Sequence, residues 1–231
     1  YVRCGGDAWR PVAVYTLHAI RADGTELRTL SPFEMFEWTP AVAGDGALIY
    51  TRWDYVDRDN MPFMGLRRMN PDGTQPAHLF GNYTHRPHTM FEARPVPGSR
   101  KLVFTAGAHH ANTGGSLVLL DVTRGEDGEA AMTRLTPEVP FPEEETTGAG
   151  DVWLHHYYAS PWPLSEAFYL TAWSHRGLRV HFKQNDDGAR MGVYLYDAFG
   201  NLDLLCADER FQVQHPIPLR PQERPPVIAS V

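Results

Sequence analysis

The chain has 231 residues, of which 42% are hydrophobic, enough to bury a sizeable core in one or two domains. Its 28 acidic and 21 basic residues give a net charge of -7, which argues against a nucleic-acid-binding surface because such affinity comes mainly from clustered Lys and Arg. No run of about 18 apolar residues and no basic-then-apolar leader occurs, so the sequence predicts neither a membrane span nor a signal peptide.

Tight turns between apolar runs recur along the chain. Gly in a short polar stretch between two apolar runs predicts a hairpin, and this pattern occurs at 18–30, 67–80, 117–136 and 193–206. A second hairpin type, with a Pro and a short polar turn before an apolar strand, alternates with the first at 40–51, 93–105 and 160–172. With 20 Gly and 19 Pro and few windows of helical period, the sequence predicts an all-β fold.

The spacing of the turns predicts a repeat. Asp23 and Asp72 open equivalent turns 49 residues apart, close to the roughly 40–50 residues of a four-stranded propeller blade. We therefore expect a β-propeller of antiparallel blades, with a β-sandwich as the alternative. The expected single domain spans 1–231 and is a partial propeller of about three to four blades, cut from a longer chain. The expected blades span 11–51, 52–105, 114–172 and 191–220, and the expected C-terminal exit linker spans 221–231.

The blade assignment sorts the connections onto two ends of the strands. The connections at one end are short, whereas those at the other end are long and hold nine of the eleven His and five of the six Trp. Because function usually sits on loops held by a rigid scaffold, the long-loop end is the candidate functional surface. Its candidate surface residues are Arg52, Trp53, Asp54, Tyr55, Asp57 and Trp173. The candidate metal or cofactor ligands are Cys4, His85, His109 and His110.

His109 and His110 are neighbours in the loop AGAHHANTGG. Side chains of neighbouring extended residues point to opposite sides. We expect one imidazole to face the other long loops, near His85 or the 52–57 loop, and the other to be fixed by backbone hydrogen bonds. This favours a functional or interdomain surface over a closed zinc site, which needs further ligands. No HExxH, CxxCH, GxSxG or P-loop motif occurs, so a nucleophilic hydrolase has no motif support.

Several stretches together resemble the hydrazine synthase alpha subunit-like family. They are EWTPAVAGDGALIYTRWDYVDRD (37–59), ARPVPGSRKLVFTAGAHH (93–110) and YLYDAFGNLDLLC (194–206). The resemblance implies an exported, periplasmic, multidomain protein in which a propeller packs beside c-type haem domains. It places Cys4 where the family has a cysteine near a haem-and-zinc site, but Phe33 where a neighbouring family pattern has a His ligand. Zinc and a neighbouring c-type haem are the implied cofactors, and any covalent haem would lie outside this chain.

Three functions remain open from the sequence. The first is a scaffold, docking or pocket-forming propeller of a redox protein, with a haem-binding domain of the same longer chain or other subunits as its partner. An enzymatic role would then be that of part of an oxidoreductase whose complete catalytic site is not in this chain. The second is a TolB-like propeller that binds a protein or ligand without catalysis. The third is a propeller that gates a hydrolase.

Overall fold

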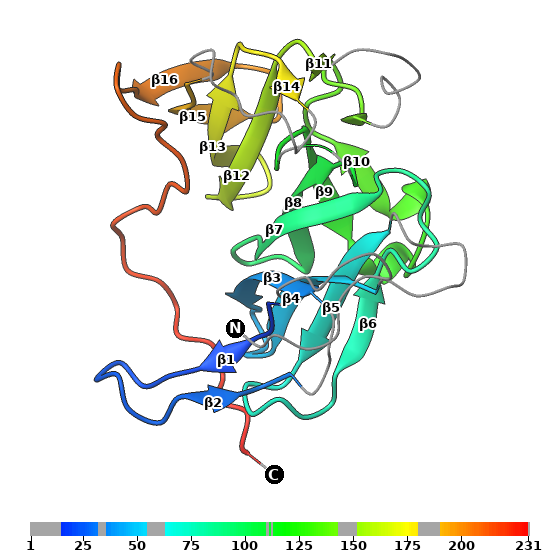
Figure 1. The fold of residues 1–231 in the computed structure, drawn as a ribbon, viewed down its shortest axis with the longest axis vertical. Coiled ribbons are helices and arrows are strands. Elements are labelled where there is room, and N and C mark those ends of the chain that lie inside the picture. The colour runs from blue at the N-terminus through cyan, green and yellow to red at the C-terminus, as the bar shows by residue number, and fades with distance from the viewer. Residues whose placement is uncertain are drawn as a thin grey trace, which may run out of the picture.

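The computed structural model describes residues 15–31, 36–54, 63–109, 111, 113–142, 152–179 and 190–230. In these residues the chain is all-β, with two short 3-10 helices, η1 (Val122–Arg124) and η2 (Glu129–Ala131). Figure 1 shows how the strands are arranged. The all-β class predicted from the sequence is therefore confirmed. Within this described part, no helix has the length and apolar character needed to span a bilayer.

Most strands belong to three four-stranded antiparallel meanders, which we call the first, second and third units. The first contains β3 (Phe36–Val42), β4 (Leu48–Trp53), β5 (Met64–Met69) and β6 (Ala77–Phe80). The second contains β7 (Thr89–Pro95), β8 (Lys101–Gly107), β9 (Ser116–Asp121) and β10 (Met132–Arg134). The third contains β12 (Tyr157–Pro163), β13 (Phe168–Ser174), β15 (Gly192–Asp197) and β16 (Leu202–Cys206).

Two small pairs complete the described strands. A hairpin joins β1 (His18–Ala19) to β2 (Arg28–Thr29), and β11 (Val152–Leu154) pairs with β14 (Leu178–Arg179). The last two strands of each unit form its outer hairpin. The β1–β2 turn resembles the turns of these outer hairpins, because in each an Asp side chain accepts the amide hydrogen of the residue two positions later. This Asp is Asp23, Asp72, Asp121 or Asp197. Asp121 lies a further 49 residues beyond Asp72. At Asp23, Asp72 and Asp121 the residue two positions later is a Thr whose hydroxyl also donates to the Asp, which distinguishes these turns from the β3–β4 turn, where Asp45 accepts the Ala47 amide hydrogen and no such hydroxyl is present.

The units begin at strands other than those expected from the sequence. They start at Phe36, Thr89 and Tyr157, whereas the expected blades begin at 11, 52, 114 and 191. In the expected fourth blade, β15 pairs with β13 and β16 pairs with β15, so both strands belong to the third unit. The repeat of turns gives the spacing of hairpins but does not say which strand opens a unit. That choice depends on pairing between strands, and among the described residues the first two units pair through the parallel contact of Met64 with Thr89.

The opening strand of every unit carries the same β-bulge. Its central residue has a positive φ: 50° at Thr39, 58° at Glu92 and 51° at Ser160. The register with the next strand shifts at each of these residues. A bulge leaves an extra residue unpaired and bends the strand, which explains why Pro is tolerated directly after Thr39 and Ser160. The opening strands β3, β7 and β12 lie next to one another, with β7 in the middle.

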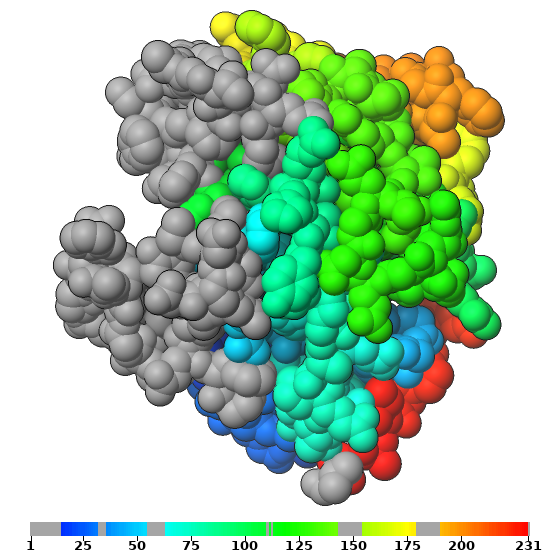
Figure 2. All heavy atoms as spheres, turned by 90° about the vertical axis from the view of Figure 1, so that its right-hand side faces the viewer, coloured from blue at the N-terminus to red at the C-terminus, as the bar shows by residue number. Residues whose placement is uncertain are grey.

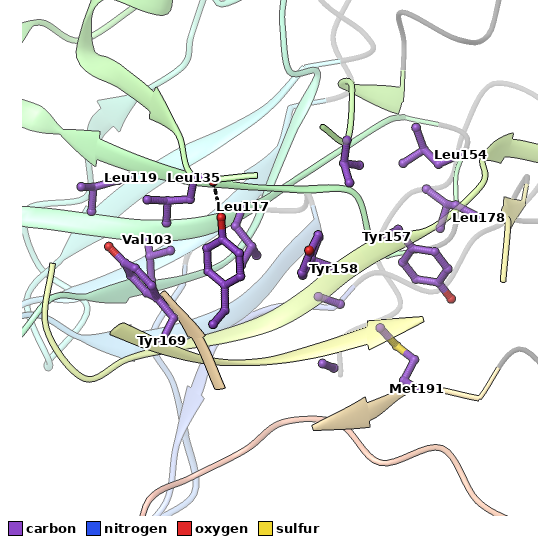
Figure 3. Packing of buried hydrophobic residues seen from close by; sticks show 14 of the residues in the cluster. Val103, Leu117, Leu119, Leu135, Leu154, Tyr157, Tyr158, Tyr169, Leu178 and Met191 are labelled. Atoms are coloured by element: carbon purple, nitrogen blue, oxygen red, sulfur yellow. Dashed lines mark hydrogen bonds between the residues drawn. The ribbon is translucent and has the colours of Figure 1, made fainter. Parts of the chain in front are cut away.

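Apolar layers hold the units together. Between the first and second units the buried side chains include Leu66, Phe80, Met90 and Phe104. Figure 3 shows the layer between the second and third units, which contains Val103, Leu117, Leu119, Leu135, Tyr157, Tyr158 and Tyr169. Fully burying one large apolar side chain contributes about 1.5–3 kcal/mol, so these two layers supply the main attraction between units.

Two segments connect one unit to another outside the apolar layers. In Figure 2 the segment after β6 (teal) lies along the second unit (green), where the Gly81 amide donates to the Glu126 carbonyl oxygen (2.9 Å). The extended segment 207–230 runs from β16 back to the β3–β4 turn (Figure 1). It passes so close to this turn that a Cβ on Gly46 would lie 2.2 Å from the Pro226 carbonyl oxygen. This segment therefore connects the third unit to the first.

Candidate functional site

An aromatic platform lies where β3 and β7 begin and where β4 and β8 end, at the long-loop end of the first two units. We define it as Phe36, Trp38, Trp53, Phe91 and His109, all of which are half-buried. The Phe36 ring stacks on Trp38 (5.4 Å between centroids) and on Trp53 (5.3 Å). Phe91 meets the edge of Trp38 at 5.9 Å, and His109 lies 5.3 Å from Trp53. Two residues predicted as site residues, Trp53 and His109, are thus in contact.

The period of the strands explains how this platform forms. Alternate residues of a strand share one face, so Phe36 and Trp38 point the same way. Phe36 is the register partner of Trp53, which brings the Trp53 ring onto the same face. The intervening Glu37 pairs with Arg52, and their side chains belong to the opposite face of the sheet. The predicted surface residues Arg52 and Trp53 are therefore neighbours in sequence but lie on different faces.

The opposite face carries an ionic cluster. The Arg52 Nε atom lies 2.6 Å from Asp54 Oδ1, and Arg67 Nη2 donates to Asp54 Oδ2 at 2.7 Å. Arg67 also donates through Nη1 to His78 Nδ1 on β6. Burial raises the pKa of the Asp54 carboxyl, but the hydrogen bonds and charges of Arg67 and Arg52 outweigh burial and hold this pKa below its ordinary value. Asp54 is therefore an anion that fixes both guanidinium groups.

Glu37 is a buried carboxyl beside this cluster. Its Oε2 atom accepts the amide hydrogen of Leu17 at 3.2 Å, which attaches the strand before the β1–β2 turn to β3. Burial raises the pKa of Glu37, although Ser31, Leu17 and Arg52 each favour the charged form. Glu37 therefore serves as an internal acceptor rather than as an exposed ligand.

A second buried carboxyl, Glu92, joins the three opening strands. Its amide donates to Thr39 Oγ1 (3.1 Å), and its carboxylate accepts hydrogen bonds from Thr105 Oγ1 (2.9 Å), the Ser160 amide (2.6 Å) and Ser160 Oγ (2.9 Å). His215 Nδ1 lies 3.1 Å from Ser160 Oγ and 3.5 Å from Glu92 Oε1. The positive-φ residues of the three bulges thus form one connected network.

The geometry of this network is that of a structural clamp. In a nucleophilic triad, the histidine uses one ring nitrogen for the serine and the other for the acid. Here the same His215 Nδ1 atom approaches both Ser160 and Glu92, and the serine hydroxyl donates to the carboxylate. Ser160 is therefore not activated as a nucleophile.

The other predicted residues contact other side chains or lie outside the described residues. His85 meets the Phe63 ring at 5.3 Å, and Trp173 lies on the third unit, where its Nε1 donates to His156 Nδ1 at 3.2 Å. Cys4, Tyr55, Asp57 and His110 fall outside the described residues, as does Phe33. Within the described ranges, no three His, Cys, Asp or Glu side chains gather in a way that could hold a metal ion.

Comparison with known proteins supports the fold. No protein-family model and no curated protein matches the sequence. Among solved structures, the chain is similar to hydrazine synthase from Kuenenia stuttgartiensis, with a TM-score of 0.53 and 16% sequence identity over 75% of this chain. The match spans 20% of that protein's chain. At this identity the likeness shows the fold alone, so the resemblance predicted from the sequence is supported as a distant structural relationship.

Proposed function

We propose that this chain is part of a β-propeller that serves as a scaffold and docking module beside c-type haem domains located outside it, in an exported redox protein. The three meanders, their shared bulges and the adjacent opening strands support propeller blades arranged about one axis. The outer-type turn of β1–β2 supports a further blade before the first unit. The fold likeness to hydrazine synthase supports the redox setting.

The aromatic platform is the observation that carries the docking role. Aromatic side chains are enriched at protein interfaces, because they combine a large apolar area with few rotatable bonds. The platform brings four such rings and His109 together at the end where the long connections lie. Every residue of the platform remains partly exposed, which leaves side-chain surface that a partner can contact.

The chemistry of the described residues also favours docking over catalysis. Glu92, Ser160 and His215 form a clamp, and the Asp54 carboxylate is held by two arginines. The sequence has no CxxCH motif, and its two cysteines are far apart, so these residues do not fit a covalently attached haem of their own. Under this proposal, the haem chemistry belongs to the partner that the platform contacts.

Photo-crosslinking in the native assembly tests this proposal. A benzophenone amino acid at Thr113, which is exposed in the connection after β8, samples the long-loop end, and the same group at Arg100 samples the short-turn end. We expect Thr113 to crosslink to a haem-staining segment or subunit and Arg100 not to do so. A haem-free partner at Thr113 would favour a TolB-like binding module instead. Equal crosslinking from both positions, or none from Thr113, would refute docking through the platform.

A further inference from the structure

A cavity of about 600 Å³ opens on the face of the first unit opposite the aromatic platform. Its inner wall includes Tyr50, Arg52, Asp54, Arg67 and His78 from β4 to β6. Its outer wall includes Asn82 and Tyr83, which follow β6, and Glu126 and Asp127 from the β9–β10 connection. Small-molecule sites commonly occupy about 300–1,000 Å³, so the cavity has the size for a small organic ligand.

The inner wall offers hydrogen-bond donors. Tyr50 is 1% exposed, and its hydroxyl has no hydrogen-bond partner among the described residues. Burial, aided by Glu37, raises the pKa of Tyr50 far above its ordinary value, so the hydroxyl keeps its proton and can donate. Arg67 uses Nη1 for His78 and Nη2 for Asp54. A guanidinium has five N–H groups in all, so Arg67 retains donors that these two bonds do not use.

The other inner groups are already engaged. His78 accepts from Arg67 at Nδ1, so its hydrogen lies on Nε2 and is donated to the Glu126 carbonyl oxygen (3.3 Å). Burial and the charge of Arg67 lower the pKa of His78, which keeps the imidazole neutral. Asp54 is held by both arginines. The two arginines of the inner wall thus outnumber Asp54 by one charge. Among the described residues, the Tyr50 hydroxyl is the buried lining group that no hydrogen bond or ion pair engages.

The outer wall has the opposite charge. The Glu126 and Asp127 side chains are exposed, and Asp127 is held in place because its Oδ1 accepts the Tyr83 amide hydrogen at 2.7 Å. Two carboxylates at the mouth attract a cationic group and repel a multiply charged anion such as phosphate. Donors inside and carboxylates outside thus complement a ligand with a carboxylate at one end and an ammonium group at the other.

We propose that this cavity binds a zwitterionic amino acid or dipeptide, with its carboxylate at Tyr50 and Arg67 and its ammonium group facing Glu126 and Asp127. The site is separate from the aromatic platform and does not depend on the docking role. Pro76 and Ala77 also line the cavity and provide apolar surface for a side chain. L-leucine and the dipeptide Gly-Leu are therefore suitable probes.

Calorimetric titration of the intact protein with matched probes tests the ligand class. Isocaproate is L-leucine without its amino group, and isoamylamine is L-leucine without its carboxylate. We expect L-leucine or Gly-Leu to bind at least about tenfold more tightly than either truncated probe, and inorganic phosphate to bind more weakly still. Absence of binding by both zwitterions, or tighter binding of phosphate, would overturn the proposal.

Two variants test the location of the site. Tyr50→Phe removes only the hydroxyl, so we expect an unchanged or higher Tm and a loss of zwitterion affinity of about five- to tenfold. Glu126→Gln should weaken L-leucine binding several-fold while leaving isocaproate binding unchanged or stronger. Glu129→Gln is the matched control, because Glu129 is exposed in the same connection but does not line the cavity. Zwitterion binding that neither Tyr50→Phe nor Glu126→Gln alters would place the ligand elsewhere and refute the assignment.

Discussion

Replacement of Glu92 tests whether the bulge network holds the units together. Glu92 is 7% exposed, and its carboxylate accepts three hydrogen bonds, one from Thr105 in its own unit and two from Ser160 in the third unit. Glu92→Ala removes every acceptor and leaves the buried Ser160 amide without its partner. A buried donor left unsatisfied costs about 1–3 kcal/mol, and the two hydroxyls can partly recover by rotating. The expected total loss is about 3–5 kcal/mol, a large fraction of the stability of a typical domain.

Two matched variants separate the causes of this loss. Glu92→Gln retains one oxygen for the Ser160 amide and Thr105 hydroxyl, and its new NH2 group can donate to Ser160 Oγ, because a hydroxyl also accepts. Its expected cost is only about 1 kcal/mol. Glu92→Gly loses the same hydrogen bonds as Glu92→Ala but tolerates the φ of 58°, so it should be about 1 kcal/mol more stable than the Ala variant.

Urea unfolding followed by tryptophan fluorescence measures these differences. The expected order of the free energy of unfolding is wild type, Glu92→Gln, Glu92→Gly and Glu92→Ala. If Glu92→Ala lay within about 0.5 kcal/mol of wild type, the network would contribute nothing to stability. If Glu92→Gln were as unstable as Glu92→Ala, the negative charge rather than the number of acceptors would be responsible.

Three further changes have defined expectations. Gly115→Ala should cost more than about 4 kcal/mol in thermal unfolding, because its Cβ would lie 1.9 Å from the Ala106 carbonyl oxygen. Gly98→Ala is the control and should cost only about 1 kcal/mol, because nothing lies within 4 Å of its Cβ. Equal Tm values for the two variants would contradict this expectation. Burial raises the pKa of Glu37 in the folded protein above its ordinary 4.5. The resulting loss of free energy of unfolding is absent at lower pH and develops as pH rises through the folded pKa. Glu37→Gln should therefore make the free energy of unfolding less dependent on pH. Parallel urea titrations of this variant and wild type between about pH 4 and about pH 7.5 would show no flattening if the carboxyl carried no penalty. Tyr196→Phe removes the hydroxyl that donates to the Leu135 carbonyl oxygen. This change should lower the free energy of unfolding by about 1–2 kcal/mol and leave the urea m-value unchanged. A loss below about 0.3 kcal/mol would show that this hydrogen bond adds nothing to stability.

Local chemistry made part of the fold predictable from the sequence. The turn at Asp72 needs a side-chain oxygen for the Thr74 amide (2.9 Å) and a left-handed residue, which Gly73 supplies at a φ of 90°. Both requirements are met within four residues, so the sequence pattern reveals the β5–β6 hairpin directly. The concentration of Trp and His in long connections likewise predicts Trp53 and His109 as site residues.

The other parts of the fold and of the candidate site could not be predicted, because they depend on contacts between residues far apart in the sequence. Ser160 meets Glu92 from 68 positions away, and the Glu126 carbonyl meets His78 from 48 positions away. No local pattern marks such partners, so the clamp, the cavity and Arg67 were missed. Two of the bulges have a weak signal in the sequence, because a Pro directly follows Thr39 and Ser160 in otherwise strand-like segments. Because Pro fits a strand only at an edge or a bulge, this signal could have located the opening strands.

The alternation of β4 explains how one short segment serves two separate sites. Tyr50 and Arg52 line the cavity together with Asp54, whereas Trp53, between the last two, joins the aromatic platform on the other face. A slip of one residue in the pairing of β3 with β4 would exchange the ionic and aromatic sets, so both sites depend on the same register. Within that register, each site is reached by its own side chains. A change at Tyr50 should therefore alter ligand binding without altering docking, and a change at Trp53 should do the reverse.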